Sequence, residues 1–298
     1  MSWDLDALVA IDTHVHVEQD GHGCCSLDQE LLDASAAYFK GDENRTPTVA
    51  DLADHYRQRR IGAVVFTVDA TTALGHPALS SDEIIDEVAE HGDVLMAFGS
   101  VDPHDPNAAG RIRELAARGA RGFKFHPSLQ NFIPNDERYY PIYEAIAEAD
   151  VPTVFHTGQT GIGAGLPGGR GIKLRYSDPM LLDDVAADFP SMTVILAHPS
   201  VPWQDAAISM ATHKANVYID LSGWLPKYFP TQLVHAANRQ LRNKVLFGSD
   251  YQVITPDRWM ASFDGLDIRD EVRPLILKEN AGAVIGLARR LDLSLIHI

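Results

Sequence analysis

Eight short apolar runs recur along the chain and alternate with longer amphipathic stretches. The runs are rich in Val, Ile and Phe, and apolar residues follow one another in them without the alternation of a half-exposed strand. Continuous apolarity is typical of parallel strands that are buried on both faces. The pattern predicts strands over 8–13, 63–68, 94–100, 122–125, 152–156, 193–198, 217–220 and 245–248.

The stretches between these runs have the spacing of amphipathic helices, with Asp, Ser or Thr near several of their starts. Helices are predicted over 49–60, 81–91, 108–118, 141–149, 180–188, 204–213 and 281–291. Alternating strands and helices indicate a parallel sheet of the α/β class, and eight strands in 298 residues favour closure into a (β/α)8 TIM barrel. The alternative is an open doubly wound sheet. That fold normally carries a G-x-G-x-x-G segment after its first strand, where this chain has Asp-Thr-His-Val-His.

Two connections are longer than ordinary barrel loops: 17–48 after the first predicted strand and 157–177 after the fifth. Long loops in a compact domain are usually functional, and barrel enzymes place their sites at this end of the strands. We predict one domain over residues 1–291. Residues 292–298 match the translation of a common sequencing adapter, so they are predicted to be a non-native tail.

The acidic balance of the chain narrows the function classes. The net charge is −16, from 25 Lys and Arg against 41 Asp and Glu, whereas nucleic-acid and anionic-membrane binders need basic surfaces. The two cysteines are adjacent, at 24 and 25, which excludes a disulfide scaffold and favours a reducing compartment. No signal peptide or membrane-spanning run is recognised, so a cytoplasmic protein is expected.

A His-x-His pair, His14 and His16, ends the first predicted strand. Residues two apart in a strand point to the same side, so both imidazoles can reach one metal ion of the Zn²⁺ type. Taken alone, the pair is equally consistent with two hydrogen-bonded polar histidines. Further polar residues at other strand ends favour a metal site. These residues are His126, His156, His198 and Asp250.

The motifs at these strand ends resemble those of the amidohydrolase superfamily. They are Asp-x-His-x-His after the first strand, a histidine after the fifth and the sixth, and Gly-Ser-Asp after the eighth. Gly-Phe-Lys-Phe-His-Pro, Ala-His-Pro and Leu-Phe-Gly-Ser-Asp resemble the amidohydrolase-related (type 2) branch. That branch includes metal-dependent hydrolases and decarboxylases of the aminocarboxymuconate-semialdehyde type. The resemblance covers about residues 10 to 287 and implies a metal-dependent TIM-barrel enzyme.

The resemblance also implies a role for each residue. His14, His16 and His156 would bind one divalent metal, with Zn²⁺ expected first and Mn²⁺ or Fe²⁺ as alternatives. Asp250 would bind or approach that metal and act as general base for its bound water. His198 would hydrogen-bond the water or the substrate, or hold a second ion. Bound Zn²⁺ lowers the pKa of water to about 7, so a carboxylate can then take its proton.

Lys124 and His126 lie on one face of the fourth predicted strand and are candidates for orienting the substrate. Members of the superfamily with two metals usually carry a carboxylated lysine or a glutamate at the end of this strand. Lys124 lies inside the strand instead, so a site with one metal is expected, and a buried ion pair is its structural alternative. The aromatic-acid decarboxylases of the branch often have Glu where this chain has His14. Hydrolysis, hydration and muconate-type decarboxylation therefore stay open.

The 157–177 loop is unusually cationic for so acidic a chain. It contains seven glycines, no Asp or Glu, and Arg170, Lys173 and Arg175. Glycine amides and an arginine fork can bind an anion, so these three cations are predicted to hold a carboxylate or phosphate of the substrate. The alternative is a surface loop whose cations pair with the aspartates that follow it.

After the seventh strand, Trp224 is predicted to form a wall for an aromatic or acyl substrate; packing or an oligomer contact is its alternative. A homodimer is expected from the resemblance alone. The glycine-rich loop resembles that of members linked to phenylpropanoid β-ketoacyl-CoA breakdown.

The favoured function is a metal-dependent hydrolase in which metal-bound hydroxide attacks a carbonyl of a small anionic or aromatic substrate. An ester, a lactone or a β-ketoacyl C–C bond would fit. The alternative is a non-oxidative metal-dependent decarboxylase of the same branch. A TatD-like nuclease, which the acidic charge disfavours, and a non-catalytic barrel subunit are weaker alternatives.

Overall fold

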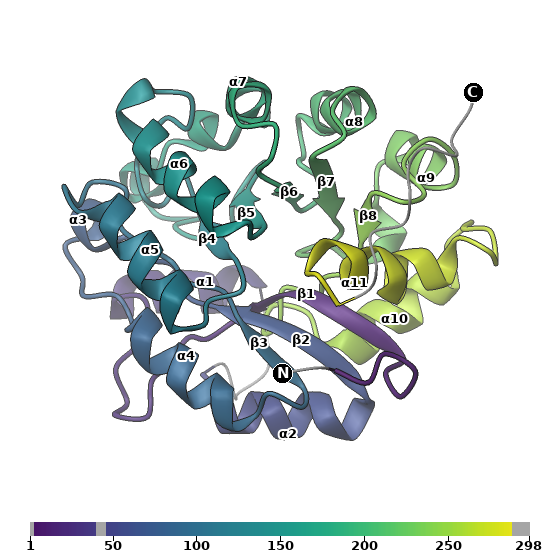
Figure 1. Cartoon of the computed structure of the whole chain (residues 1–298), viewed down its shortest axis with the longest axis horizontal. Coiled ribbons are helices and arrows are strands. Elements are labelled where there is room, and N and C mark those ends of the chain that lie inside the picture. Colours follow the sequence, from purple (N-terminus) through teal and green to yellow (C-terminus); the bar gives the residue numbers. More distant parts are fainter. Residues whose placement is uncertain (1–2, 40–45, 288–298) are drawn as a thin grey trace.

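The computed structural model describes residues 3–39 and 46–287. Within these residues, eight parallel strands lie at the centre and helices connect and surround them (Figure 1). Each strand overlaps its predicted range. The strands are β1 (Ala10–His16), β2 (Ile61–Phe66), β3 (Leu95–Ala97), β4 (Phe123–Phe125), β5 (Thr153–His156), β6 (Val194–Ala197), β7 (Val217–Asp220) and β8 (Val245–Leu246).

The strands pair in sequence order, β1 to β3 in one sheet and β4 to β8 in another. Backbone hydrogen bonds connect the two sheets at both seams. The Gly99 amide donates to the Gly122 carbonyl where β3 meets β4, and the Asp250 amide donates to the His14 carbonyl where β8 meets β1, both at 2.9 Å. The predicted (β/α)8 TIM barrel is therefore confirmed.

Helices connect the strands, and most of them lie outside the ring (Figure 1). They are α1 (Gln29–Phe39), α2 (Val49–Arg59), α3 (Thr71–Leu74), α4 (Ser81–Glu90), α5 (Ala108–Arg118), α6 (Tyr140–Ala149), α7 (Leu181–Asp188), α8 (Gln204–His213), α9 (Thr231–Ala237), α10 (Pro256–Asp264) and α11 (Asn280–Val284).

Side chains alternate along the strands between two apolar clusters. Ile11 and Val64 belong to the cluster inside the barrel, whereas Ala10 and Val65 belong to the larger one between strands and helices. Burial on both faces explains why the strands lack polar alternation in the sequence.

Two predictions about helices need correction. The 17–48 connection contains α1, whose Leu31 is fully buried, so this segment is not a plain loop. The helix predicted over 281–291 ends at Val284, and Gly286 just beyond it has a φ of +75°, which does not continue a helix. The predicted tail, 292–298, lies outside the described residues.

The two long connections meet above the carboxyl ends of the strands. We call α1 together with residues 157–177 the roof. A small apolar cluster joins its two parts, with Leu27 and Leu32 on one side and Ile162, Leu166 and Ile172 on the other. In the described ranges, no helix has the length and apolarity needed to cross a membrane.

Candidate active site

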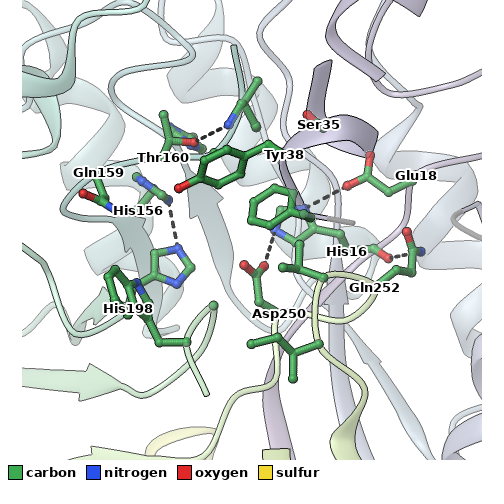
Figure 2. Close-up of a pocket in the computed structure, with 18 of the residues that line it drawn as sticks. His16, Glu18, Ser35, Tyr38, His156, Gln159, Thr160, His198, Asp250 and Gln252 are labelled. Atoms are coloured by element: carbon green, nitrogen blue, oxygen red, sulfur yellow. Dashed lines mark hydrogen bonds and ion pairs between the residues drawn. The ribbon is translucent and has the colours of Figure 1, made fainter. Parts of the chain in front are cut away.

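The carboxyl ends of the strands open into a pocket with a cavity volume of about 390 Å³. We call its polar base the floor; it is formed by His16, His126, His156, His198 and Asp250. Figure 2 shows His16 and Asp250 on one side of the pocket and His156 and His198 on the other. The structure thus brings together five residues that the sequence singled out, at the end of the barrel where such enzymes carry reactive groups.

Asp250 contacts both histidines of the first strand. Its Oδ1 lies 3.3 Å from Nε2 of His16 and 3.5 Å from Nε2 of His14. The three side chains offer ligand atoms that all lie within 4.8 Å of one another. Asp250 has a φ of 62°, a left-handed conformation that a seam hydrogen bond to His14 helps to hold.

Asp220, the last residue of β7, orients His14 from behind. Its Oδ2 lies 2.9 Å from Nδ1 of His14, and its Oδ1 accepts from the amides of Ser222 (2.9 Å) and His198 (3.3 Å). A carboxylate bound to Nδ1 leaves the Nε2 lone pair free, as in metal-binding histidines. Asp220 was not among the predicted site residues, although its place at a strand end was a usable signal.

The other histidines of the floor contact one another. Nδ1 of His156 lies 2.9 Å from Nε2 of His198, and the rings of His126 and His156 stack with centroids 3.7 Å apart. Nδ1 of His126 accepts from the Leu129 amide at 3.2 Å, so its neutral ring carries the proton on Nε2. Among the described residues, Nε2 of His126 and Nε2 of His156 are buried without a hydrogen-bond partner. Two nitrogens of the floor are therefore available to a substrate or a metal.

Lys124 lies beneath the floor. Its side chain is fully buried over the ring of Phe66, and its Nζ lies 3.0 Å from Nε2 of His14. The expected contact between Lys124 and the substrate stays a prediction, and Lys124 itself does not line the pocket. The physical reason is that Lys124 is the middle residue of β4 and points into the barrel below the strand ends.

The ionisation of these groups follows from their burial and their neighbours. Burial, followed by the charge of Lys124, lowers the pKa of His14 to about 3. Burial lowers the pKa of Lys124 to about 8. Burial opposes the charged form of Asp250, but its contact with His16 holds the pKa of Asp250 below the usual value. Burial also lowers the pKa of His126, His156 and His198, so at neutral pH these floor imidazoles are neutral beside a charged carboxylate.

This donor set fits a divalent metal, which requires deprotonated ligands. Two groups of the described residues have suitable spacing: His14, His16 and Asp250, and His14, His198 and Asp220. His156, the third predicted histidine ligand, belongs to neither group, because its Nδ1 faces His198. Nε2 of His156 has no hydrogen-bond partner among the described residues, so His156 could bind a metal through this atom.

The cations of the glycine-rich loop do not reach the pocket. Arg170 forms ion pairs with Asp28 and, at 3.1 Å, with Glu30. Lys173 and Arg175 lie against a tyrosine ring of their own loop. None of the three lines the pocket, and the expectation that they bind the substrate stays a prediction. Arg170 instead joins the two parts of the roof, with partners from the other long connection.

Aromatic side chains form much of the pocket wall. Trp224 lines it as predicted, together with Tyr38, Phe39 and Tyr228. In Figure 2, Tyr38 extends into the pocket. The sequence did not single out the two α1 residues, because their segment was treated as a loop. The amphipathic spacing of that segment was the signal that could have shown a helix.

Gly223 lies where the wall meets the floor. It has a φ of +73°, and a Cβ there would lie 2.7 Å from Nδ1 of His198 and 3.1 Å from Oδ2 of Asp250. Only glycine combines this conformation with so close an approach. The chain after β7 can therefore pass directly against two floor residues.

Three solved structures show the same fold at low sequence identity. An uncharacterized TIM-barrel protein from Bordetella bronchiseptica has a TM-score of 0.76 and 19% identity, over 93% of this chain and 98% of the other. The 5-carboxyvanillate decarboxylase LigW from Sphingomonas paucimobilis has a TM-score of 0.66 and 15% identity, over 94% and 100%. A dihydroxybenzoic acid decarboxylase from Polaromonas sp. JS666, with bound manganese and the inhibitor 2-nitroresorcinol, has a TM-score of 0.65 and 18% identity, over 98% and 100%.

No curated protein sequence matches the chain. The sequence model of the amidohydrolase family matches residues 11–287, which includes every floor residue, β2 to β8 and all of β1 except Ala10. The strand-end histidines, the aspartate of the last strand and the barrel that assembles them agree with this match. The chain therefore belongs to the amidohydrolase family, in the amidohydrolase-related branch that also contains decarboxylases.

Proposed function

We propose that the protein is a metal-dependent lyase that removes a carboxyl group, without oxidation, from a small aromatic or otherwise unsaturated carboxylic acid. The observation that carries this proposal is the pocket itself. A floor that contains three imidazoles with lowered pKa values, those of His126, His156 and His198, and one charged carboxylate faces walls that are largely apolar and aromatic. A cavity of about 390 Å³ is large enough for a single-ring acid.

The metal would be held by His14, His16 and Asp250, with His156 as a further ligand through Nε2. When bound, the metal supplies positive charge that stabilises negative charge developing on a substrate oxygen. Asp220 keeps His14 in the tautomer that this role needs, because it accepts from Nδ1.

Asp250 is the proton carrier of this proposal. Decarboxylation breaks the bond between a substrate carbon and its carboxyl carbon, leaves the electron pair on the substrate carbon and requires a proton there. Asp250 is charged at neutral pH, where the carboxyl group of the substrate is ionised as well, so it first accepts a proton from a phenol of the substrate or from solvent. It then returns that proton to the carbon as CO₂ leaves, so each turnover is balanced.

His126 and His198 position the substrate. His126 lines the pocket and the Nε2 proton of its ring has no partner among the described residues, so this proton could be donated to a substrate oxygen. Nδ1 of His198 lies 2.9 Å from Oγ of Ser222, and this contact fixes the plane of the His198 ring. Stacking on His156 similarly fixes the ring of His126.

The structural neighbours support a lyase over a hydrolase. LigW acts on 5-carboxyvanillate, and the Polaromonas protein acts on dihydroxybenzoic acid and holds manganese. Manganese should therefore be tested beside the zinc that the sequence led us to expect. The homodimer and the cytoplasmic location expected from the sequence stay predictions.

Hydrolysis at an ester, a lactone or a β-ketoacyl C–C bond is the second candidate. His14 favours it, because the aromatic-acid decarboxylases that the chain resembles often have Glu at this position. In that reaction Asp250 would take a proton from the attacking water, and its charged state suits this role equally well.

The first test is metal content, measured by elemental analysis of the purified protein and of a His14→Ala/His16→Ala variant. About one equivalent of zinc or manganese that is lost in the variant supports the site. Absence of metal after reconstitution with excess Zn²⁺ and Mn²⁺ would overturn the proposed function.

The second test identifies the product. The metal-loaded protein is incubated in D₂O with 2,6-dihydroxybenzoate and with 5-carboxyvanillate. A decarboxylase releases CO₂ and leaves one deuteron on the carbon that lost it. Release of a new acid from lactone or β-ketoacyl substrates, with no CO₂ from any acid tested, would select hydrolysis instead.

A further inference from the structure

Arg258 on α10 lines the pocket. Of the described residues that line it, Arg258 is the one lysine or arginine. The cations that the sequence suggested for an anionic substrate, in the glycine-rich loop, lie elsewhere. Any full positive charge that the pocket offers to a substrate, besides a metal, therefore comes from α10.

The acidic residues around Arg258 are bound by other groups. Asp257, next to it in the chain, forms an ion pair with Arg59 on α2 at 2.7 Å. Glu18, the one carboxylate of the pocket wall among the described residues, contacts His16 at 3.4 Å and accepts from the hydroxyl of Ser26. Among residues 3–39 and 46–287, no carboxylate forms an ion pair with the guanidinium of Arg258, in contrast to Arg170. The guanidinium is thus available to a ligand.

The surroundings of Arg258 are apolar on the pocket side. Val253 and Ile254, which precede its helix, line the same pocket, and Ile254 is 7% exposed. Arg258 itself is exposed, so it lies at the mouth of the pocket and not on the floor. A planar guanidinium at the edge of an apolar wall binds a carboxylate through two parallel hydrogen bonds.

We propose that Arg258 anchors a second anionic group of the substrate at the mouth while the first carboxyl group meets the floor. The substrate class is then a dianionic single-ring acid, in the first instance an aromatic dicarboxylate. This inference rests on the proposed function only in placing the reacting carboxyl at the floor. It assigns specificity to α10, which follows the last strand.

The test is a binding measurement that needs no turnover. Isophthalate and terephthalate are titrated into the manganese-loaded protein by calorimetry, beside their monoamides, which have the same shape but one charge fewer. The wild-type protein should bind at least one dicarboxylate about 10- to 100-fold more tightly than its monoamide, the size expected of a charge-assisted hydrogen-bond pair.

Arg258→Met should abolish this preference, and Arg258→Lys should restore part of it, because lysine keeps the charge but not the fork. The matched control is Arg121→Met. Arg121 is exposed, does not line the pocket and precedes β4 at the far end of the barrel. Arg121→Met makes the same change in charge as Arg258→Met and should leave the preference for dicarboxylates unchanged.

Equal affinity for dicarboxylates and monoamides in the wild-type protein, or no binding of either, would overturn the proposal. An equal loss of the preference for dicarboxylates in Arg121→Met and in Arg258→Met would also overturn it. A failure of the proposed function gives a different result. No acid tested would then release CO₂, but the protein would still bind dicarboxylates more tightly than monoamides.

Discussion

The floor and the roof of the pocket are held in place by different means. The floor consists of residues at the ends of strands, and their neighbours in the barrel fix them through buried contacts such as that of His198 with Ser222. The roof consists of α1 and the 157–177 loop, joined by a small apolar cluster and by the ion pairs of Arg170. Barrel geometry alone determines the floor, whereas the roof depends on contacts between two segments far apart in the sequence.

This difference suggests that the floor and the roof have different functions. Buried, hydrogen-bonded groups hold a reactive geometry well, because every displacement leaves a polar atom unpaired. Partly exposed ion pairs contribute little to stability and can be rearranged at small cost. We therefore expect the floor to determine the reaction and the roof to adapt to the shape of the substrate.

The largest effect is expected at the floor, for Asp250→Asn. The variant keeps the size of the side chain but removes the charge that accepts a proton, so kcat should fall by about 10²- to 10⁴-fold. Steady-state kinetics on the metal-loaded protein provide the measurement. Asp257→Asn, at an exposed carboxylate on α10, is the control and should keep normal activity. A fall of less than tenfold in Asp250→Asn would assign proton transfer to another group.

A smaller effect is expected where the wall meets the floor, for Gly223→Ala. The new Cβ would displace His198 and Asp250, and misplacement by about 1 Å can cost about 10²-fold in rate. Gly75→Ala is the control, because Gly75 has a similar φ of +67° and no atom within 4 Å of the added Cβ. Equal activity in the two variants would show that the floor tolerates movement.

The buried histidines predict how stability depends on pH. Burial lowers the pKa of His14, His126, His156 and His198 below the usual 6.5. The unfolded chain then binds more protons than the folded one below about pH 6.5, so the free energy of unfolding should fall as the pH drops through that value. For His14 the loss continues to about pH 3.

Urea unfolding of the chelated protein at a series of pH values measures this dependence. His126→Gln removes one of the four groups and should give a shallower slope. His213→Gln, at an exposed position on α8, should leave the slope unchanged. A flat profile between about pH 7 and about pH 5 would mean that these rings are already protonated in the folded state.

The smallest effect is expected in the roof, for Arg170→Met. Its ion pairs are partly exposed, so the free energy of unfolding should change by less than about 1 kcal/mol. Proteolysis within 157–177 should become faster, because the loop loses its contact with α1. Arg113→Met breaks the exposed pair with Glu148 and should leave that cleavage rate unchanged. A large loss of kcat in Arg170→Met would show that the roof, like the floor, contributes directly to the reaction.

The same contrast explains what could be predicted from the sequence. Strand ends were visible because apolar runs stop at fixed residues, so His14, His156 and Asp250 could be placed together. Asp220 was not predicted, because the motifs at the strand ends pointed to histidines as the metal ligands. Arg170 was expected at the substrate and Arg258 was not singled out, because the sequence does not show which cation meets a carboxylate from a distant segment. That outcome is decided by tertiary contacts.

The hydrogen bond from the Asp250 amide to the His14 carbonyl has a consequence for biosynthesis. It joins the first strand to the segment after the last, so the group of His14, His16 and Asp250 is incomplete until the chain through Asp250 has left the ribosome. A nascent barrel that lacks its final strand has no carboxylate beside Nε2 of His16 and cannot hold an ion in this group. Acquisition of the metal would thus mark the moment at which the ring of strands is complete.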